Sequence, residues 1–212
     1  MEIHDEIKAS FIISLIGNTK AGKTCLIKRY VENEFSQDTL STIGTEKFSK
    51  IITIKKTEKN IEKEIPIKLD FFDTTGQERF LSLSPKFIKN AHSVIFVIDL
   101  YSENDLNLLN HWIKILQDNI KIKCVVIYCG SKIDLENTQK RYFFKENYEE
   151  LNKKLKGYYF ETSSKNNEGI EEMMNFISQE VYKNFYDDII NTKNHQILLQ
   201  KTPKNKKNCC LH

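Results

Sequence analysis

The 212-residue sequence contains no apolar run that reaches the roughly 18 residues needed to cross a lipid bilayer. Its formal net charge is only +3, so the charge gives no reason to expect a nucleic-acid partner. An apolar stretch at residues 11–16 follows several acidic residues and precedes no cleavage-like run of small residues. We therefore expect no signal peptide and a protein that stays in the cytosol.

Glycine is scarce as well, because the whole chain has only seven. Five of them follow or separate strand-like runs: Gly17, Gly22, Gly44, Gly76 and Gly130. In an open α/β sheet such positions lie at the carboxyl edge, where ligands bind. The placement of these few glycines therefore predicts a ligand site at that edge.

The five cysteines are predicted to fall into two groups. Cys25, Cys124 and Cys129 lie in apolar segments, so we expect reduced core residues in a cytosolic protein. Cys209 and Cys210 are adjacent and close to the last residue. A metal or redox role for this pair is disfavoured, because no third or fourth ligand is nearby.

Strand-like and helix-like stretches alternate along the chain. β-branched runs predict strands at 11–16, 51–54, 65–72, 93–98, 123–129 and 158–161. Amphipathic stretches predict helices at 23–33, 106–118, 143–155 and 169–185. Nearly continuous apolar strands indicate a mostly parallel sheet covered by helices on both faces. The two strands without a helix between them predict one antiparallel hairpin, with an exposed charged tip at 55–64.

A phosphate-binding motif lies between the first predicted strand and the first predicted helix. Residues 17–24, G-N-T-K-A-G-K-T, match G-x-x-x-x-G-K-[ST] without gaps. Gly17 and Gly22 let the backbone N–H groups turn toward phosphate oxygens. Lys23 would bridge the β- and γ-phosphates, and Thr24 would offer its hydroxyl to Mg²⁺. This motif leaves the choice between ATP and GTP open.

Two later loops favour guanine. In residues 130–134, G-S-K-I-D, the carboxylate of Asp134 can accept hydrogen bonds from the N1–H and N2–H₂ groups of guanine, a donor pair that adenine lacks. Lys132 can lay its methylenes over the base. In residues 161–165, E-T-S-S-K, the backbone N–H of Ser164 can meet the guanine O6. Either loop alone would be interpreted as an ordinary surface loop, but their order after the phosphate motif favours the prediction of a guanine site.

These motifs together resemble those of the Ras-superfamily small GTPases, and specifically the Rab branch. The resemblance also rests on S-T-I-G at 41–44, D-T-T-G-Q-E-R-F at 73–80 and the ending C-C-L-H at 209–212. It implies a P-loop NTPase G domain at residues 1–185, with a six-stranded, mostly parallel sheet, one antiparallel strand and helices on both faces. Residues 186–212 are expected to form a flexible basic tail that ends in a prenylation motif.

The resemblance assigns roles at the nucleotide. Thr24 and Thr42 would bind Mg²⁺ directly, and Asp73 would act through a water molecule. Gly76 would donate its backbone N–H to the γ-phosphate, and Gln77 would be the catalytic residue that orients the attacking water. The other residues placed at the nucleotide are Thr19, Lys20, Ala21, Cys25, Phe35, Thr39, Ser131, Ser163 and Lys165.

The implied function is a GTP/GDP switch in vesicular membrane traffic that hydrolyses GTP slowly. The implied partners are a GTPase-activating protein, an exchange factor, effectors, a prenylation escort protein and a GDP-dissociation inhibitor, with no nucleic acid and a monomeric G domain. Geranylgeranyl groups on Cys209 and Cys210 would anchor the chain to the cytoplasmic face of an intracellular membrane, from which it would cycle to the cytosol. The alternative for the tail is an unmodified end.

Four departures from the Rab pattern affect this expectation. Lys20 replaces the usual glycine, and Ser131 replaces the asparagine that braces the phosphate loop and the base. Thr75 replaces alanine beside the γ-phosphate. Lys47 replaces an aromatic residue of the effector surface, and Phe48, one position later, would point to the opposite face of its strand.

Two other functions therefore stay open. A guanine-nucleotide-binding scaffold with little hydrolysis is favoured by Thr75 and Ser131, whereas Gln77 favours a hydrolysing switch. A P-loop kinase or ATPase is disfavoured by Asp134. For Phe35 the alternative to packing on guanine is simple core packing.

Overall fold

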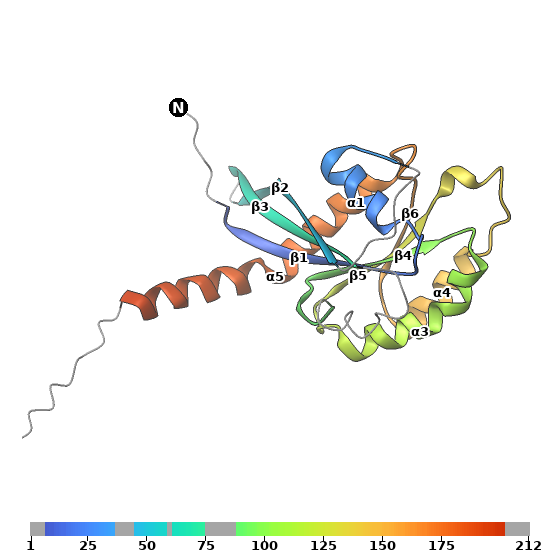
Figure 1. The fold of residues 1–212 in the computed structure, drawn as a ribbon. Coiled ribbons are helices and arrows are strands. Elements are labelled where there is room, and N and C mark those ends of the chain that lie inside the picture. The colour runs from blue at the N-terminus through green and yellow to red at the C-terminus, as the bar shows by residue number, and fades with distance from the viewer. Residues whose placement is uncertain (1–6, 37–44, 59–60, 75–87, 202–212) are drawn as a thin grey trace, which may run out of the picture.

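The computed structural model describes residues 7–36, 45–58, 61–74 and 88–201 of the chain (Figure 1). The strands are β1 (Ala9–Ile16), β2 (Thr45–Glu58), β3 (Ile61–Thr74), β4 (Ser93–Asp99), β5 (Val125–Ser131) and β6 (Tyr158–Thr162). The helices are α1 (Lys23–Glu32), α3 (Glu103–Asn119), the 3₁₀ turn η2 (Ile133–Leu135), α4 (Lys145–Lys154) and α5 (Ile170–Lys201).

The strands form one sheet in the order β2-β3-β1-β4-β5-β6. β2 is antiparallel to β3, and every other neighbouring pair is parallel. α1 and α5 pack on one face, and α3 and α4 pack on the other. The predicted mostly parallel α/β sheet with one antiparallel strand is therefore confirmed. Because β1, β3, β4, β5 and β6 run in the same direction, their carboxyl ends lie at one edge of the sheet, where ligands bind in such folds.

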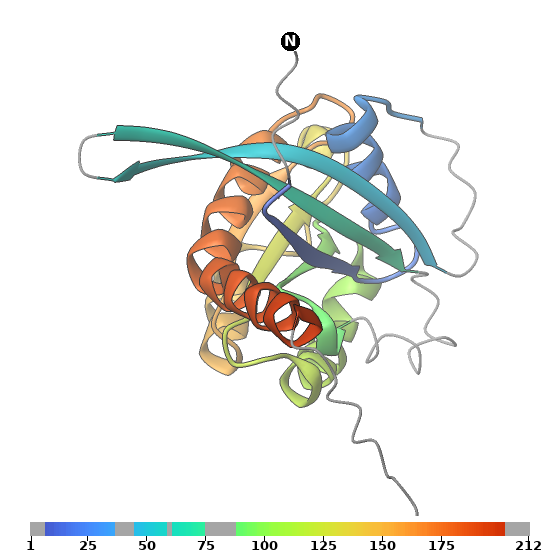
Figure 2. The ribbon, with the colours of Figure 1, turned by 90° about the vertical axis from the view of Figure 1, so that its left-hand side faces the viewer.

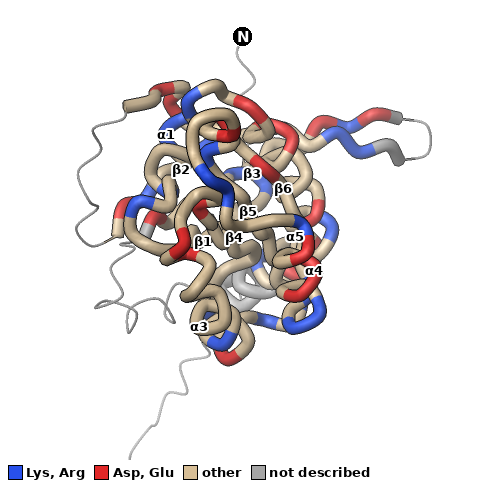
Figure 3. The backbone as a smooth tube through the Cα atoms, turned by 90° about the vertical axis from the view of Figure 1, so that its right-hand side faces the viewer, with Lys and Arg blue, Asp and Glu red and all other residues tan. Residues whose placement is uncertain are grey.

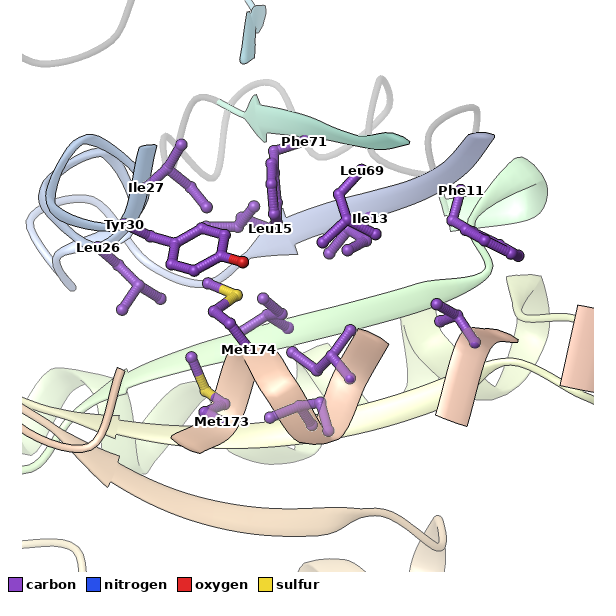
Figure 4. Close-up of a cluster of buried hydrophobic side chains, with 14 of the residues drawn as sticks. Phe11, Ile13, Leu15, Leu26, Ile27, Tyr30, Leu69, Phe71, Met173 and Met174 are labelled. Atoms are coloured by element: carbon purple, nitrogen blue, oxygen red, sulfur yellow. The ribbon is translucent and has the colours of Figure 1, made fainter. Parts of the chain in front are cut away.

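Two apolar clusters hold the helices on the sheet. In the first, alternate β1 side chains such as Phe11 and Leu15 pack against α1 and α5, where Tyr30 and Met174 lie (Figure 4). The second lies between β4, β5, α3 and α4 and contains Trp112. All seven residues of β5 are buried, as expected for a central parallel strand covered on both faces.

The three cysteines of the described chain agree in part with the core assignment. Cys129 is fully buried, whereas Cys25 and Cys124 are only partly buried. All three are free thiols. Burial raises the pKa of the Cys129 thiol to about 12, so it is a packing residue rather than a nucleophile.

The β2–β3 hairpin is longer than the sequence pattern predicts. An exposed tip is expected at 55–64 from the sequence, but residues 55–58 continue β2 and residues 61–64 belong to β3, with Lys55 opposite Glu64. Figure 2 shows this ribbon projecting beyond the rest of the sheet, and Figure 3 shows acidic and basic residues along it. Lysine and glutamate are depleted in strands. The Lys55–Glu64 pair favours this one, the like-charged Lys56–Lys63 pair opposes it, and Ile54 and Ile65 pack against the first cluster.

Helix α5 also continues past its predicted end at residue 185 and reaches Lys201. The apolar periodicity weakens there, but Ile189 still packs against the first cluster. Two lysine contacts fix this part of the helix: Lys123 Nζ lies 2.9 Å from Asp188 Oδ2, and Lys193 Nζ donates to the carbonyl oxygen of Lys8 at 3.0 Å. The predicted boundary between domain and tail therefore falls inside a helix. Within the described residues, none of the helices has the length and hydropathy of a membrane span.

Candidate functional site

The loop between β1 and α1 has a backbone that only certain residues adopt without strain. Gly17 and Gly22 have positive φ angles of 134° and 101°. A Cβ atom on Gly17 would lie 2.2 Å from the carbonyl oxygen of Val97 on β4, so this position excludes any side chain. Lys20 also has a positive φ, of 67°, which disfavours a lysine there relative to a glycine by about 1 kcal/mol. Its side chain is exposed.

Lys23, the first residue of α1, points back into this loop. Its Nζ donates to the carbonyl oxygens of Gly17 at 2.9 Å and of Asn18 at 2.8 Å. Burial lowers the pKa of this ammonium to about 8, and the negative charges of Asp73 and Asp105 oppose that shift. Two of its three N–H donors are used within the loop, which leaves the third for an anion.

Thr24 and Asp73 meet beside Lys23. The Thr24 hydroxyl donates to Asp73 Oδ2 at 2.5 Å, although the two residues are 49 positions apart. Asp73 is fully buried at the carboxyl end of β3. A hydroxyl and a carboxylate are the oxygen ligands that Mg²⁺ prefers, so the pair fits that ion.

Ser131 connects the end of β5 to the phosphate loop. Its hydroxyl lies 2.7 Å from the carbonyl oxygen of Ala21 and 3.1 Å from that of Ile98. A Cβ on Gly22 would lie 3.8 Å from the Ser131 Cβ, an ordinary van der Waals distance, so this position needs a glycine for its positive φ rather than for space. The shorter hydroxyl of Ser131 therefore still reaches the phosphate loop, although it lacks the amide that the family pattern has at this position.

The two base-recognition loops also contact each other. Ser163, after β6, donates through Oγ to Asp134 Oδ1 at 2.7 Å, so the carboxylate is held from the neighbouring loop. Lys132 has a left-handed backbone with φ 69° and forms a 2.7 Å ion pair with Asp99. The side chains of Lys132 and Asp134 are both half-buried. The arrangement places Asp134 at the edge of the sheet beside the phosphate loop.

Arg29 joins α1 to the loop after β6. Its Nε donates to the carbonyl oxygen of Ser164 at 2.8 Å, and its Nη2 lies 3.5 Å from that of Lys165. Its guanidinium carbon lies 5.9 Å from the centre of the Phe35 ring. Phe35 belongs to neither apolar cluster, which weakens the core-packing alternative for this residue.

Of the other residues predicted at the nucleotide, some lie in the described structure and some lie outside it. Ala21 is buried within the loop, and the Cys25 thiol lies 3.8 Å from the carbonyl oxygen of Ser36. The Thr19 hydroxyl is buried and has no hydrogen-bond partner among the described residues. Four residues with assigned roles, and Thr75, lie outside the described chain: Thr39, Thr42, Gly76 and Gln77.

Comparison with known proteins agrees with the resemblance that the motifs show. The profile of the Ras family matches residues 12–183. Ras-related protein Rab-30 of Homo sapiens is 33% identical over 163 residues, which cover 77% of this chain and 75% of that protein. Ras-related protein Rab-13 of Mesocricetus auratus is 32% identical over 171 residues, 81% of this chain and 79% of that protein. The GTP-binding protein YPT52 of Saccharomyces cerevisiae is 29% identical over 206 residues, 88% of each chain.

The chain belongs to the Ras family. Its Rab-named relatives make it a divergent Rab-like small GTPase. The predictions of family and of a GTP-hydrolysing enzyme are thereby confirmed at this level.

The sheet face of this Rab-like GTPase differs from the pattern as expected at Lys47. The β2–β3 register runs without a bulge and pairs Lys47 with Phe72, while Phe48 is buried in the core. The Lys47 ammonium lies 5.6 Å from the centre of the Phe72 ring and 3.2 Å from Asp70. Burial alone would raise the pKa of Asp70, but hydrogen bonds from Ser49 and other neighbours lower it. A salt-bridged polar cluster thus lies beside Phe72 on this face.

The sequence did not predict a set of contacts between the phosphate loop and α3 in this Rab-like GTPase. Asn18, an unspecified position of the phosphate motif, contacts Asp105 and Trp112 of α3. The spacing Ser102-x-x-Asp105 is a helix N-cap signature, and Ser102 does cap α3. That signal could have located the start of α3, but it could not have shown that Asp105 also reaches the phosphate loop.

Proposed function

We propose that this Rab-like GTPase binds GTP and GDP at the carboxyl edge of its sheet and regulates vesicular membrane traffic by switching between the two. The main support is the position of Lys23, whose buried ammonium donates hydrogen bonds to the carbonyl oxygens of Gly17 and Asn18. Its remaining donor supports a contact with the β- and γ-phosphate oxygens. The loop N–H groups and the N-terminus of α1 favour the same anion.

Thr24 and Thr42 would bind Mg²⁺ directly, and Asp73 would act through a water molecule. The 2.5 Å contact between the Thr24 hydroxyl and Asp73 supports this assignment, since both oxygens already converge on one place. When bound, Mg²⁺ neutralises the negative charge of the phosphates that are held and transferred.

Asp134 would select guanine by accepting two hydrogen bonds from the base. Its contact with Ser163 orients the carboxylate, and Lys132 and Phe35 would line the two sides of the ring. Ser164 would donate its backbone N–H, in a loop that Arg29 holds through the Ser164 carbonyl oxygen.

Hydrolysis would depend on Gln77, which orients the attacking water, and on the backbone N–H of Gly76. Turnover would be slow without an activating protein. The Ser131 argument for the scaffold alternative is reduced to the missing amide toward the base, because the Ser131 hydroxyl still contacts the phosphate loop. Thr75 supports the scaffold alternative as before.

As a Ras-family member, the chain works with regulators and effectors. The specific partners we propose are an activating protein, an exchange factor, a prenylation escort protein and a GDP-dissociation inhibitor. Geranylgeranyl groups on Cys209 and Cys210 would anchor it to the cytoplasmic face of an intracellular membrane, since two lipid chains bind stably where one does not. Loss of membrane partitioning in the Cys209→Ser, Cys210→Ser double variant would support the anchor, and unchanged partitioning would contradict it.

The site is tested by competition between nucleotides. Fluorescent GDP bound to the purified full chain should be displaced by unlabelled GDP and not by ADP. Asp134→Ala should abolish this preference, whereas Glu136→Gln, which changes an exposed acid two positions away, should keep it. Displacement by ADP as effective as by GDP in the unaltered chain would refute the guanine site.

Hydrolysis needs its own measurement. Single-turnover cleavage of GTP should become much slower in Gln77→Leu and faster in Thr75→Ala if Thr75 crowds the attacking water. An unchanged rate in Gln77→Leu would remove the catalytic role of Gln77. An unchanged rate in Thr75→Ala would remove the reason for the scaffold alternative.

A further inference from the structure

Asn18 of the phosphate loop is clamped by two residues of α3. Its side-chain Nδ2 donates to Asp105 Oδ1 at 2.9 Å, and its Oδ1 accepts from the Trp112 indole Nε1–H at 2.7 Å. All three residues are at least nine-tenths buried. None of them was selected by the phosphate motif, the guanine motifs or the proposed catalytic set.

The polarity of these contacts allows only one orientation of the Asn18 amide. An indole N–H is a donor only, and an ionised carboxylate is an acceptor only. Rotating the amide by 180° would set its N–H₂ group against the Trp112 N–H and its oxygen against the Asp105 carboxylate. The two α3 side chains therefore fix the rotation of Asn18 as well as its position.

Asp105 is itself held in place. Its Oδ2 accepts from the backbone N–H of Asp99 at 2.9 Å, and its Oδ1 accepts from the Ser102 hydroxyl at 3.1 Å. With the bond from Asn18, its carboxylate has three hydrogen-bond donors around it. Burial raises the pKa of this carboxylate, and the three hydrogen bonds lower it without cancelling that rise, so they offset part of the cost of burying the charge. They also hold the α3 side of the contact in one position.

The contact continues from Asn18 to Lys23. The backbone carbonyl oxygen of Asn18 accepts from Lys23 Nζ at 2.8 Å and from the backbone N–H of Ala21 at 3.2 Å. The carbonyl that holds the ammonium thus belongs to the residue whose side chain α3 clamps. A shift or rotation of Asn18 moves an acceptor of Lys23 and one of the bonds that close the loop.

We infer that Asp105 and Trp112 are positioning residues for nucleotide binding: by clamping the Asn18 side chain they hold the Asn18 carbonyl oxygen, and through it Lys23, in the arrangement that receives the phosphates. This inference rests on the proposed phosphate-binding role of Lys23. The Asp105 carboxylate also adds a negative charge that favours the ammonium form of Lys23. A purely structural role in packing α3 on the sheet would predict no special effect on the nucleotide.

The test is a charge exchange between Asn18 and Asp105. Asn18→Asp alone puts two carboxylates in hydrogen-bond contact, and Asp105→Asn alone removes the charge. In the double variant, the new carboxylate at 18 can accept from Trp112 and from the new amide at 105, whose oxygen can still accept from the Asp99 N–H. Polar complementarity is thus restored with the two groups exchanged.

The measurement is the release rate of fluorescent GDP, with Mg²⁺, from the full-length protein. Asn18→Asp and Trp112→Phe should each release GDP roughly tenfold faster, since each loses hydrogen bonding at the loop. The double variant should release it close to the wild-type rate. Asp70→Asn is the matched control, because it neutralises a buried, hydrogen-bonded carboxylate on the sheet face away from the phosphate loop, and it should leave release unchanged.

The outcomes separate this inference from the function on which it rests. If Lys23→Ala releases GDP rapidly while Asn18→Asp and Trp112→Phe match the wild type, the clamp does not position the site. If the double variant is no slower than Asn18→Asp, the exchange argument is wrong. If Lys23→Ala retains GDP as well as the wild type does, the proposed phosphate-binding role of Lys23 is wrong, and the inference about the clamp loses its basis.

Trp112 supplies a second readout, because it is the only tryptophan of the chain. Its indole N–H is bonded to the phosphate loop, so removal of nucleotide with a chelator should change its emission. Asn18→Leu, which cannot accept that bond, should suppress the change even when nucleotide loss is confirmed independently. Emission that responds equally in both proteins would contradict the coupling.

Discussion

The protein should lose stability on mild acidification because of one buried histidine. His92 lies at the start of β4, where its Nδ1 accepts from the backbone N–H of Ile12 at 2.8 Å. Its ring lies between Phe11 and Phe185, with ring centres 5.6 and 4.8 Å away. Burial, together with the positive charge of Lys121, lowers its pKa from the ordinary 6.5 to about 4.

The direction of the effect follows from this lowered pKa. Between about pH 6.5 and pH 4 the unfolded chain binds a proton at His92 and the folded chain does not, so stability falls as the pH falls. The full shift would remove about 2 kcal/mol of stability between roughly pH 7.5 and pH 5. Since the ring is only half-buried, solvent reduces the expected loss to about 1 to 2 kcal/mol.

The assay is the free energy of unfolding by urea across this pH range, in the wild type and in His92→Asn. The Asn oxygen can still accept from the Ile12 N–H but does not titrate. The variant should be less stable near neutral pH, because it loses the ring contacts, and its disadvantage should shrink as the pH falls. Parallel pH curves for the two proteins would refute the assignment, whatever other groups titrate.

Three further outcomes follow from the fold and the site. Gly17→Ala should lower nucleotide affinity more than tenfold, because the added Cβ would lie 2.2 Å from the Val97 carbonyl oxygen; binding by fluorescence titration checks this. Ser131→Ala should speed GDP release several-fold, since it removes about 1 kcal/mol of hydrogen bonding to the phosphate loop. Ending the chain at Phe185 should lower the midpoint of thermal unfolding, whereas ending it at Lys201 should leave the midpoint unchanged, because only the first removes the packed part of α5.

The sequence predicts those parts of the fold and the site that depend on residues close together in the chain. The apolar run of β5 predicts a strand buried on both faces, and the motif at 17–24 places its turn and its lysine by local backbone geometry. These features depend on residues within a few positions of each other. A sequence pattern contains that information directly.

Contacts between distant side chains could not be predicted in the same way. Asn18 and Trp112 are 94 positions apart, and Arg29 and Ser164 are 135 apart. Periodicity assigns Trp112 to the buried side of α3, but it does not show which polar atom its N–H meets. That partner depends on how α3 lies across the sheet, which is a property of the whole packed domain.

The same limit explains the two errors in element length. The Lys- and Glu-rich tip of the hairpin has the composition of a loop, yet cross-strand pairing continues through it. The part of α5 beyond residue 185 has a weak apolar period, yet Asp188 pairs with Lys123 and Lys193 donates to the carbonyl oxygen of Lys8. In both segments the contacts that decide the structure come from elements distant in the chain.

Ser131 shows why single departures from a family pattern are poor guides to lost function. Exchange of an asparagine for a serine shortens the side chain and removes an amide that braces both the phosphate loop and the base. The Ser131 hydroxyl nevertheless lies 2.7 Å from the carbonyl oxygen of Ala21, so the short side chain still reaches the loop. Whether Ser131 weakens nucleotide binding thus depends on its missing amide toward the base and not on the phosphate loop. Ser131→Ala removes the hydroxyl that contacts the carbonyl oxygens of both Ala21 and Ile98, so its effect on GDP release measures the contribution of this hydroxyl.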